Sequence, residues 1–246
     1  MQELKPFWNR IFKFNWAFAL VLVLVVCVTR FVLVLDANKS ANYGLIGIVM
    51  FISAITPFIF LTKYGRKQIG MVKPKKYSAL LIAFISGLIF SLILHYLGYN
   101  LYGSTYKNWY VYIAKSYNIP EVISKHDKAI LFGIMAFTGI IFSPIGEELF
   151  FRGIIHSAFA KAIGDTKASL ADSSAFALTH ISHFGLVYLN SQWDFFPTPA
   201  LIWVAGMFLV SLTFFAFKKY SGSIIGAIVC HAGFNLGMIY SIFYLL

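Results

Sequence analysis

Seven long apolar stretches alternate with short polar connections along the chain. Each of them approaches or exceeds the ~20 residues that a helix needs to cross the hydrocarbon core of a bilayer. The stretches cover 16–35, 43–61, 78–99, 128–163, 168–189, 200–217 and 222–246. They predict an all-α fold, a polytopic membrane bundle of about seven transmembrane helices. The fourth helix is long enough to tilt or to project beyond the membrane.

The composition agrees with this pattern. Of the 246 residues, 59% are hydrophobic and 12% are charged, and the mean hydropathy is +0.77. Soluble domains carry about 25% charged residues, so the composition excludes an ordinary soluble fold. Residues 1–15 interleave basic with aromatic side chains and are expected to form a basic interfacial segment. With no repeat or linker in sight, residues 16–246 are expected to form a single membrane domain.

Basic residues are distributed unevenly among the connections between the stretches. Thirteen lie on the side of the N-terminus and five on the opposite side. Because short cytoplasmic loops are enriched in Lys and Arg, the N-terminus is expected to be cytoplasmic. This bias accounts for the net charge of +11 without a nucleic-acid partner. The expected partner is a lipid bilayer, and a compact chain without a targeting extension suggests a multi-pass protein of the bacterial inner or plasma membrane.

The cysteines and the longest polar connection carry little specific chemistry. Cys27 and Cys230 both lie in apolar stretches, which argues against a disulfide framework, and two cysteines alone cannot form a structural zinc site. Residues 100–127 hold five tyrosines and Trp109, a composition typical of an aromatic layer at the membrane interface. A role in gating access of a substrate is the alternative.

The most informative stretch places two carboxylates and a guanidinium inside the fourth apolar region. Glu147 and Glu148 are adjacent, so on a helix their side chains point about 100° apart and do not share one target. Glu148 precedes Arg152 by four residues, the favourable order for an intrahelical ion pair. Glu147 is then left without a local partner and is free to face the interior of the bundle. A carboxylate in that position suits a general base.

Two further polar groups lie within apolar stretches. Phe176 and His180 are four residues apart in the fifth, and His231 and Asn235 are four apart in the seventh, so each pair shares a helix face. Their expected depths lie within roughly 10 Å of that of Glu147 along the membrane normal. Each histidine alone could simply bond a neighbouring helix, but three such groups at one depth favour a functional site.

The other histidines give weaker signals. His183 follows His180 by three residues, so a part in the same site stays open. His95, His126 and His156 fall at the ends of apolar stretches or in connections, and an interfacial position is expected for them. No Gly-x-Ser-x-Gly elbow occurs in the sequence, so a serine hydrolase of that type is not indicated.

In this order, the three groups resemble the signature of the CAAX-processing and bacteriocin-processing family of intramembrane proteases (the CPBP or Abi family). The family pattern of Glu-Glu-x-x-x-Arg, Phe-x-x-x-His and His-x-x-x-Asn is met by Glu147, Glu148, Arg152, Phe176, His180, His231 and Asn235. The resemblance covers about residues 128–246, which would carry the catalytic core. It implies an endopeptidase that acts on a membrane-associated protein or peptide, and it leaves open whether that substrate is prenylated.

The mechanism that these residues and the resemblance favour uses no cofactor. Glu147 takes a proton from a water that His180 positions, and His231 and Asn235 donate hydrogen bonds to the oxyanion. Glu148, Arg152 and Phe176 are then supporting residues. In the alternative, Glu147, His180 and His231 bind Zn2+ or another divalent metal and leave a fourth position for water. The absence of His-Glu-x-x-His and the poor metal affinity of Asn235 disfavour it.

Two readings without enzymatic activity are also compatible with ionisable residues at midplane. A proton-coupled transporter often has repeated halves with broken helices in corresponding positions, and the sequence shows no such symmetry. An immunity or scaffold protein would act only by binding, and it would tolerate the isosteric change Glu147→Gln.

Overall fold

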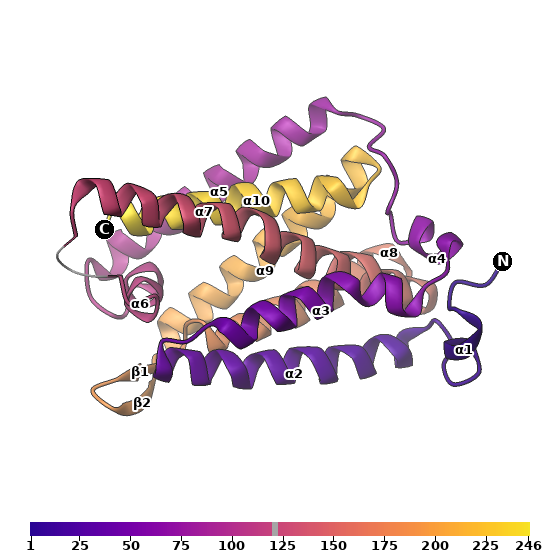
Figure 1. Ribbon diagram of the computed structural model, residues 1–246, viewed down its shortest axis with the longest axis horizontal. Helices are drawn as coiled ribbons and strands as arrows, with labels where there is room; N and C mark the ends of the chain where they lie inside the picture. The colour runs from indigo at the N-terminus through magenta and orange to yellow at the C-terminus, as the bar shows by residue number, and fades with distance from the viewer. Residues whose placement is uncertain (120–122) are drawn as a thin grey trace.

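A computed structural model describes residues 1–119 and 123–246. Helices form nearly all of the regular structure (Figure 1), in agreement with the predicted all-α class. The long helices are α2 (Trp16–Ser40), α3 (Gly44–Phe60), α5 (Ser78–Tyr102), α7 (Lys125–Glu148), α8 (His156–Thr179), α9 (Pro197–Ser221) and α10 (Ile224–Tyr244). The short elements are α1 (Pro6–Asn9), α4 (Lys63–Gln68), α6 (Trp109–Ser116), η1 (Leu149–Ile155), η2 (His180–Ser182), β1 (Leu186–Leu189) and β2 (Gln192–Phe195).

Within the described residues, five helical stretches are long and apolar enough to cross a membrane. They are Trp16–Ser40, Ser78–Tyr102, Lys125–Ser182, Pro197–Ser221 and Ile224–Tyr244, and α3 is a shorter apolar helix of 17 residues. The chain is therefore a multi-pass membrane protein by length and composition. The predicted fourth and fifth spans belong to one helical run that breaks at Gly164, where φ is +78°. The count of seven spans remains a prediction.

The predicted fifth span is wrong at its C-terminal end. The helix stops at Thr179, and the last residues of the predicted span form strand β1, which pairs with β2 in an antiparallel hairpin. Asn190 and Ser191 connect the strands with φ values of +49° and +64°. A two-residue connection with positive φ at both positions matches the right-handed twist of the strands. The apolar residues before Asn190 thus belong to a hairpin.

The connections gather at two opposite ends of the bundle. The N-terminus, α1 and α4 lie at one end, and α6, the hairpin and the C-terminus lie at the other (Figure 1). Most of the basic connections are at the first end, as the charge distribution suggested. Residues 120–122 of the predicted outer connection lie outside the described residues.

The predicted interfacial segment 1–15 is mostly non-helical. Within it, α1 spans four residues, and Leu4 forms an isolated antiparallel bridge with Leu61. The indole nitrogen of Trp8 donates to the carbonyl oxygen of Ile59 at 2.9 Å. These contacts attach the segment to the end of α3. The division into an interfacial segment and a membrane domain stays a prediction.

Three aromatic residues of α6 are packed inside the protein, which contradicts the interfacial layer predicted for them, whereas Tyr106 before the helix is 44% exposed. Trp109, Tyr110 and Tyr112 are buried. Trp109 stacks on Trp203 with 6.2 Å between ring centroids, and the Tyr110 hydroxyl lies 2.7 Å from that of Ser91. Because the phenol groups find partners within the bundle, their rings can be buried. Burial raises the pKa of Tyr112.

Helices α5 and α10 cross with their backbones in contact. A Cβ atom on Gly87 would lie 1.9 Å from the carbonyl oxygen of Cys230, and one on Gly233 would lie 2.1 Å from that of Phe84. Small residues permit such close approach between apolar helices. Gly233 lies between His231 and Asn235 in the sequence and points to the opposite side of α10. The crossing therefore turns His231 and Asn235 away from α5.

Candidate active site

Glu147 and Glu148 occupy the last positions of α7, where the helix widens into the π-helix η1. Single π-turns are rare in proteins and occur frequently at functional sites. Arg152 lies inside η1, and all three charged side chains are buried. The unusual local geometry coincides with the stretch that the sequence singled out.

Glu147 has a partner that the sequence analysis missed. One carboxylate oxygen, Oε1, lies 3.0 Å from Nη2 of Arg30 on α2 and accepts a hydrogen bond from the Ser143 hydroxyl at 2.7 Å. The prediction that Glu147 lacks a local partner is therefore wrong. Within the described residues, its second oxygen, Oε2, is buried without a hydrogen-bond partner. Glu147 is anchored on one side and has a spare acceptor on the other.

In the sequence, the feature that points to Arg30 is its charge within an apolar stretch. Arginine at membrane depth is costly unless it is paired or lines a wet cavity. Its partner is 117 residues away in the sequence, so no helical spacing could reveal it. Only the three-dimensional structure identifies the pair.

His180 and His183 lie where α8 ends. Nδ1 of His180 is 2.7 Å from the carbonyl oxygen of Phe176, which fixes the ring and leaves Nε2 without that constraint. Nε2 of His183 lies 3.4 Å from Nη2 of Arg30. The question left open for His183 is thus answered in part, because the ring stands beside the Arg30–Glu147 pair.

His231 and Asn235 project from one face of α10, as their spacing predicted. Nδ1 of His231 lies 2.8 Å from Oε1 of Glu148, and its ring stacks on Phe214 with 4.5 Å between centroids. The amide nitrogen of Asn235 donates to the carbonyl oxygen of Gly139 at 2.9 Å. These contacts leave Nε2 of His231 and the second amide hydrogen of Asn235 for a ligand.

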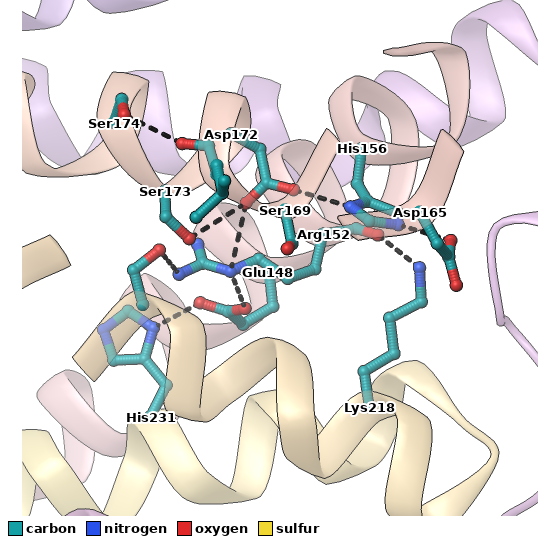
Figure 2. Close-up of polar contacts among 12 residues, drawn as sticks. Glu148, Arg152, His156, Asp165, Ser169, Asp172, Ser173, Ser174, Lys218 and His231 are labelled. Carbon is teal, nitrogen blue, oxygen red and sulfur yellow. Dashed lines mark hydrogen bonds and ion pairs between the residues drawn. The ribbon is translucent and has the colours of Figure 1, made fainter. Parts of the chain in front are cut away.

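Glu148 and Arg152 form the predicted ion pair, with 3.2 Å between Oε2 and Nε. The guanidinium carbon of Arg152 lies 4.5 Å from the ring centroid of Phe176 and 5.3 Å from that of Phe214. These cation–π contacts enclose the charge in an aromatic layer. Figure 2 shows Glu148 between the guanidinium of Arg152 and the ring of His231.

The four predicted catalytic residues line a single cavity of about 410 Å³, which we call the central cavity. Arg30 and His183 also line it, whereas Glu148 and Arg152 do not. Ile113 and Tyr117, at the C-terminal end of α6, form part of the wall. Much of the remaining wall is apolar and includes Ile46, Met50, Met135, Phe142, Met207, Phe234, Met238 and Ile239. A few convergent polar groups in an apolar cavity are typical of a substrate site.

Comparison with known proteins gives one match that bears on this geometry. Residues 129–237 match the sequence model of the Rce1-like type II CAAX prenyl endopeptidases. Residues 129–237 belong to that family. The match begins within α7, ends within α10 and contains every motif position from Glu147 to Asn235. No curated protein and no solved structure matches the chain.

The donor set of the Rce1-like domain does not fit a metal ion well. Across the described residues, no group of three or more His, Cys, Asp or Glu side chains is arranged to hold one. Arg30 places a permanent positive charge 3.0 Å from Glu147 and 3.4 Å from His183. Glu147 would be one of the ligands, so a second cation there would be repelled by Arg30.

A second set of buried ionisable residues extends from the Rce1-like motif. His156, for which an interfacial position was predicted, is buried, and its nitrogens lie 2.7 Å from Asp172 and 3.0 Å from Asp165. His95 is likewise buried, whereas His126 is exposed. We call Glu148, Arg152, His231, Asp172 and His156 together the ionic cluster. The interfacial prediction failed because both histidines find polar or aromatic partners inside the bundle.

Proposed function

We propose that the protein is an intramembrane endopeptidase that hydrolyses a peptide bond of a membrane-associated protein or peptide. The observation that carries the proposal is that Oε2 of Glu147 has no hydrogen-bond partner among the described residues and lies beside a cavity that His180, His231 and Asn235 also line. Buried polar atoms without a partner are uncommon, and a catalytic role is one of the recognised reasons for them. Membership of the Rce1-like family supports the same reaction class.

Glu147 acts as the general base in the proposed mechanism. Arg30 and Ser143 hold Oε1, so Oε2 is the atom that takes a proton from the attacking water. His180 positions that water through Nε2, because its Nδ1 is committed to the carbonyl oxygen of Phe176. The resulting hydroxide attacks the carbonyl carbon, and the proton passes to the amine that leaves. A well-placed base contributes roughly 10²–10⁴-fold to such a reaction.

His231 and Asn235 stabilise the oxyanion that forms on the substrate carbonyl. Asn235 has a second amide hydrogen besides the one donated to Gly139. His231 donates through Nε2, and the Glu148 carboxylate, 2.8 Å from Nδ1, holds the ring in place. Glu148 therefore supports the oxyanion site through His231. Donors aimed at developing charge are worth about 2.7–4 kcal/mol each.

The proposed orientation places the basic end of the bundle in the cytoplasm. The connections that contain most of the lysines and arginines gather at the end where the N-terminus lies (Figure 1), as expected for cytoplasmic segments. Labelling of the variants Lys67→Cys and Tyr106→Cys in intact cells tests this orientation. Only the cysteine at position 106 is expected to react, because it would lie on the outer side.

Comparative proteomics of membrane and secreted peptides tests the proposed function. Cells that carry wild-type protein should release peptides that are absent from cells with Glu147→Gln. If the protein acts only by binding, or is a transporter that acts on no peptide, Glu147→Gln would leave the peptide profile unchanged. Metal analysis of purified, active protein distinguishes the zinc alternative from the metal-free mechanism. A stoichiometric ion whose removal also removes activity would contradict the mechanism above.

A further inference from the structure

Behind the central cavity, the ionic cluster continues beyond the motif residues to His156. Figure 2 shows Asp172 between Arg152 and His156, with Asp165 beyond. Arg152 and Asp172 are fully buried, and His156 is 2% exposed. The Asp172 carboxylate and the His156 imidazole lie 2.7 Å apart, which offsets the cost of burying both groups.

Two carboxylates approach Nε of Arg152, and Figure 2 shows the guanidinium between them. Nε of Arg152 is 3.2 Å from Oε2 of Glu148 and 4.0 Å from Oδ1 of Asp172. Neither contact has the geometry of a hydrogen bond, and within the described residues Nε lacks such a partner. The guanidinium is thus held by charge between two competing acids. A small displacement toward Asp172 would weaken its contact with Glu148.

The other oxygen of Asp172 is committed to His156. Nδ1 of His156 lies 2.7 Å from Oδ2 of Asp172, and the Ser173 hydroxyl lies 3.5 Å from Oδ1. The second nitrogen of His156 faces Asp165, which pairs in turn with Lys219. The pair with His156 reduces the attraction that Asp172 exerts on Arg152.

We propose that His156 and Asp172 are positioning residues for the reaction in the central cavity. His156 engages Asp172, so that Arg152 remains with Glu148 and Glu148 keeps its contact with Nδ1 of His231. The proposal rests on the function proposed above, since it supposes that His231 takes part in the reaction. Neither His156 nor Asp172 lines the cavity, and both act only through their neighbours.

The remaining charged groups around the pair leave this competition intact. Lys218 on α9 donates to the backbone carbonyl oxygen of Arg152, and the Ser211 hydroxyl accepts from Nη2 of Arg152. The ring of Phe215 covers His156 with 4.5 Å between centroids. These contacts fix the backbone and one end of the guanidinium, but they do not decide which carboxylate attracts Nε.

A double-mutant cycle tests the proposal in purified full-length protein. His156→Gln leaves the Asp172 carboxylate free to draw Arg152 from Glu148, and we expect kcat to fall by about 10–100-fold, as for other supporting residues of catalytic groups. KM should stay unchanged, because the cavity wall is intact. Asp172→Asn removes the competitor, so the double variant His156→Gln/Asp172→Asn should recover most of the lost kcat. The exposed His126, changed to Gln, is the matched control.

Thermal unfolding of the same variants provides a readout that does not depend on activity. His156→Gln should lower Tm, because a buried carboxylate loses its partner, and the double variant should unfold at a higher temperature than this single variant. A double variant that is as impaired as His156→Gln, or more so, in both kcat and Tm would overturn the proposal. If wild-type protein cleaves nothing, the proposed function fails, whereas the order of Tm values still decides whether His156 acts through Asp172.

Discussion

Glu147 and Glu148 are neighbours in the sequence, but their carboxylates lie in different surroundings. Glu147 borders the central cavity, is held at one oxygen by Arg30 and Ser143, and has no partner at the other within the described residues. Glu148 lies in the ionic cluster, where its two oxygens face His231 and Arg152. Its exposed fraction is 0%, and it does not line the cavity.

In the proposed mechanism, one helix end supplies both a reacting group and its support. Adjacent residues of a helix point about 100° apart, so the end of α7 presents one carboxylate to the cavity and the other to the ionic cluster. A spare acceptor suits proton transfer, whereas a carboxylate shared between a guanidinium and an imidazole suits the orientation of His231. Substitutions in the two regions should therefore affect the reaction rate and the stability of the protein to different extents.

The largest effect on rate outside Glu147 is expected at His180. His180→Ala removes the group that positions the attacking water, and kcat should fall by roughly 10²–10⁴-fold. Hydrolysis of a substrate peptide identified by proteomics would be measured with purified protein. His126→Ala is the control, because that histidine is exposed on α7, and equal rates for both variants would place His180 outside the reaction.

A slightly smaller loss is expected at the oxyanion site. Asn235→Ala removes one donor, and kcat should fall by about 10²–10³-fold. Asn235 also bonds Gly139 on α7, so Tm is measured in parallel to exclude a packing defect. A loss confined to KM would show that Asn235 binds the substrate without stabilising the oxyanion.

Glu148→Gln should act mainly on stability. Within the described residues, it leaves the fully buried Arg152 with Asp172 as its remaining charge partner, and breaking a buried pair costs about 3–5 kcal/mol. Denaturation in detergent is expected to show this loss, together with a fall in kcat because His231 loses its support. Unchanged stability would mean that Asp172 alone suffices for Arg152 and would weaken the distinction between the two regions.

The smallest effect is expected far from both regions, at the pair of Glu3 and Lys161, whose charged atoms are 2.6 Å apart. Partial burial raises the pKa of Glu3, but the hydrogen bond from Lys161 and the charge of that lysine outweigh it and lower the pKa overall. The pair therefore stabilises the folded state at neutral pH, and this contribution disappears as the pH falls through the lowered pKa.

Replacement of Lys161 tests that surface pair. Lys161→Gln should lower the free energy of unfolding by about 0.2–1 kcal/mol at neutral pH. It should have no effect on stability once Glu3 is protonated in both the folded and the unfolded state, and it should leave activity unchanged. Thermal unfolding at two pH values measures the difference. A cost that persists at low pH would mean that packing, and not charge, accounts for the contact.

The sequence allowed the core of the candidate site to be predicted. Glu147, His180, His231 and Asn235 each lie in an apolar stretch where polar groups are costly, and helical spacing gives the face each occupies. The structure brings all four to one cavity. The same reasoning identified the pair of Glu148 with Arg152, because a contact between residues four apart is local.

The parts that could not be predicted depend on contacts between distant segments. Arg30 pairs with Glu147 from another helix, and Asp172 with His156 across the break at Gly164. The hairpin that follows α8 contains apolar residues that also suit a transmembrane helix. Likewise, aromatic composition does not distinguish a membrane interface from a buried layer, so the packing of α6 inside the protein was predicted wrongly.

The most direct test of the account is the isosteric substitution Glu147→Gln in purified protein reconstituted into lipid. Peptide products are quantified by mass spectrometry, and folding is monitored by Tm. We expect cleavage to be lost while the protein remains folded, because Gln keeps the shape of the side chain but accepts no proton from water. Cleavage at the wild-type rate by a folded Glu147→Gln protein would contradict it.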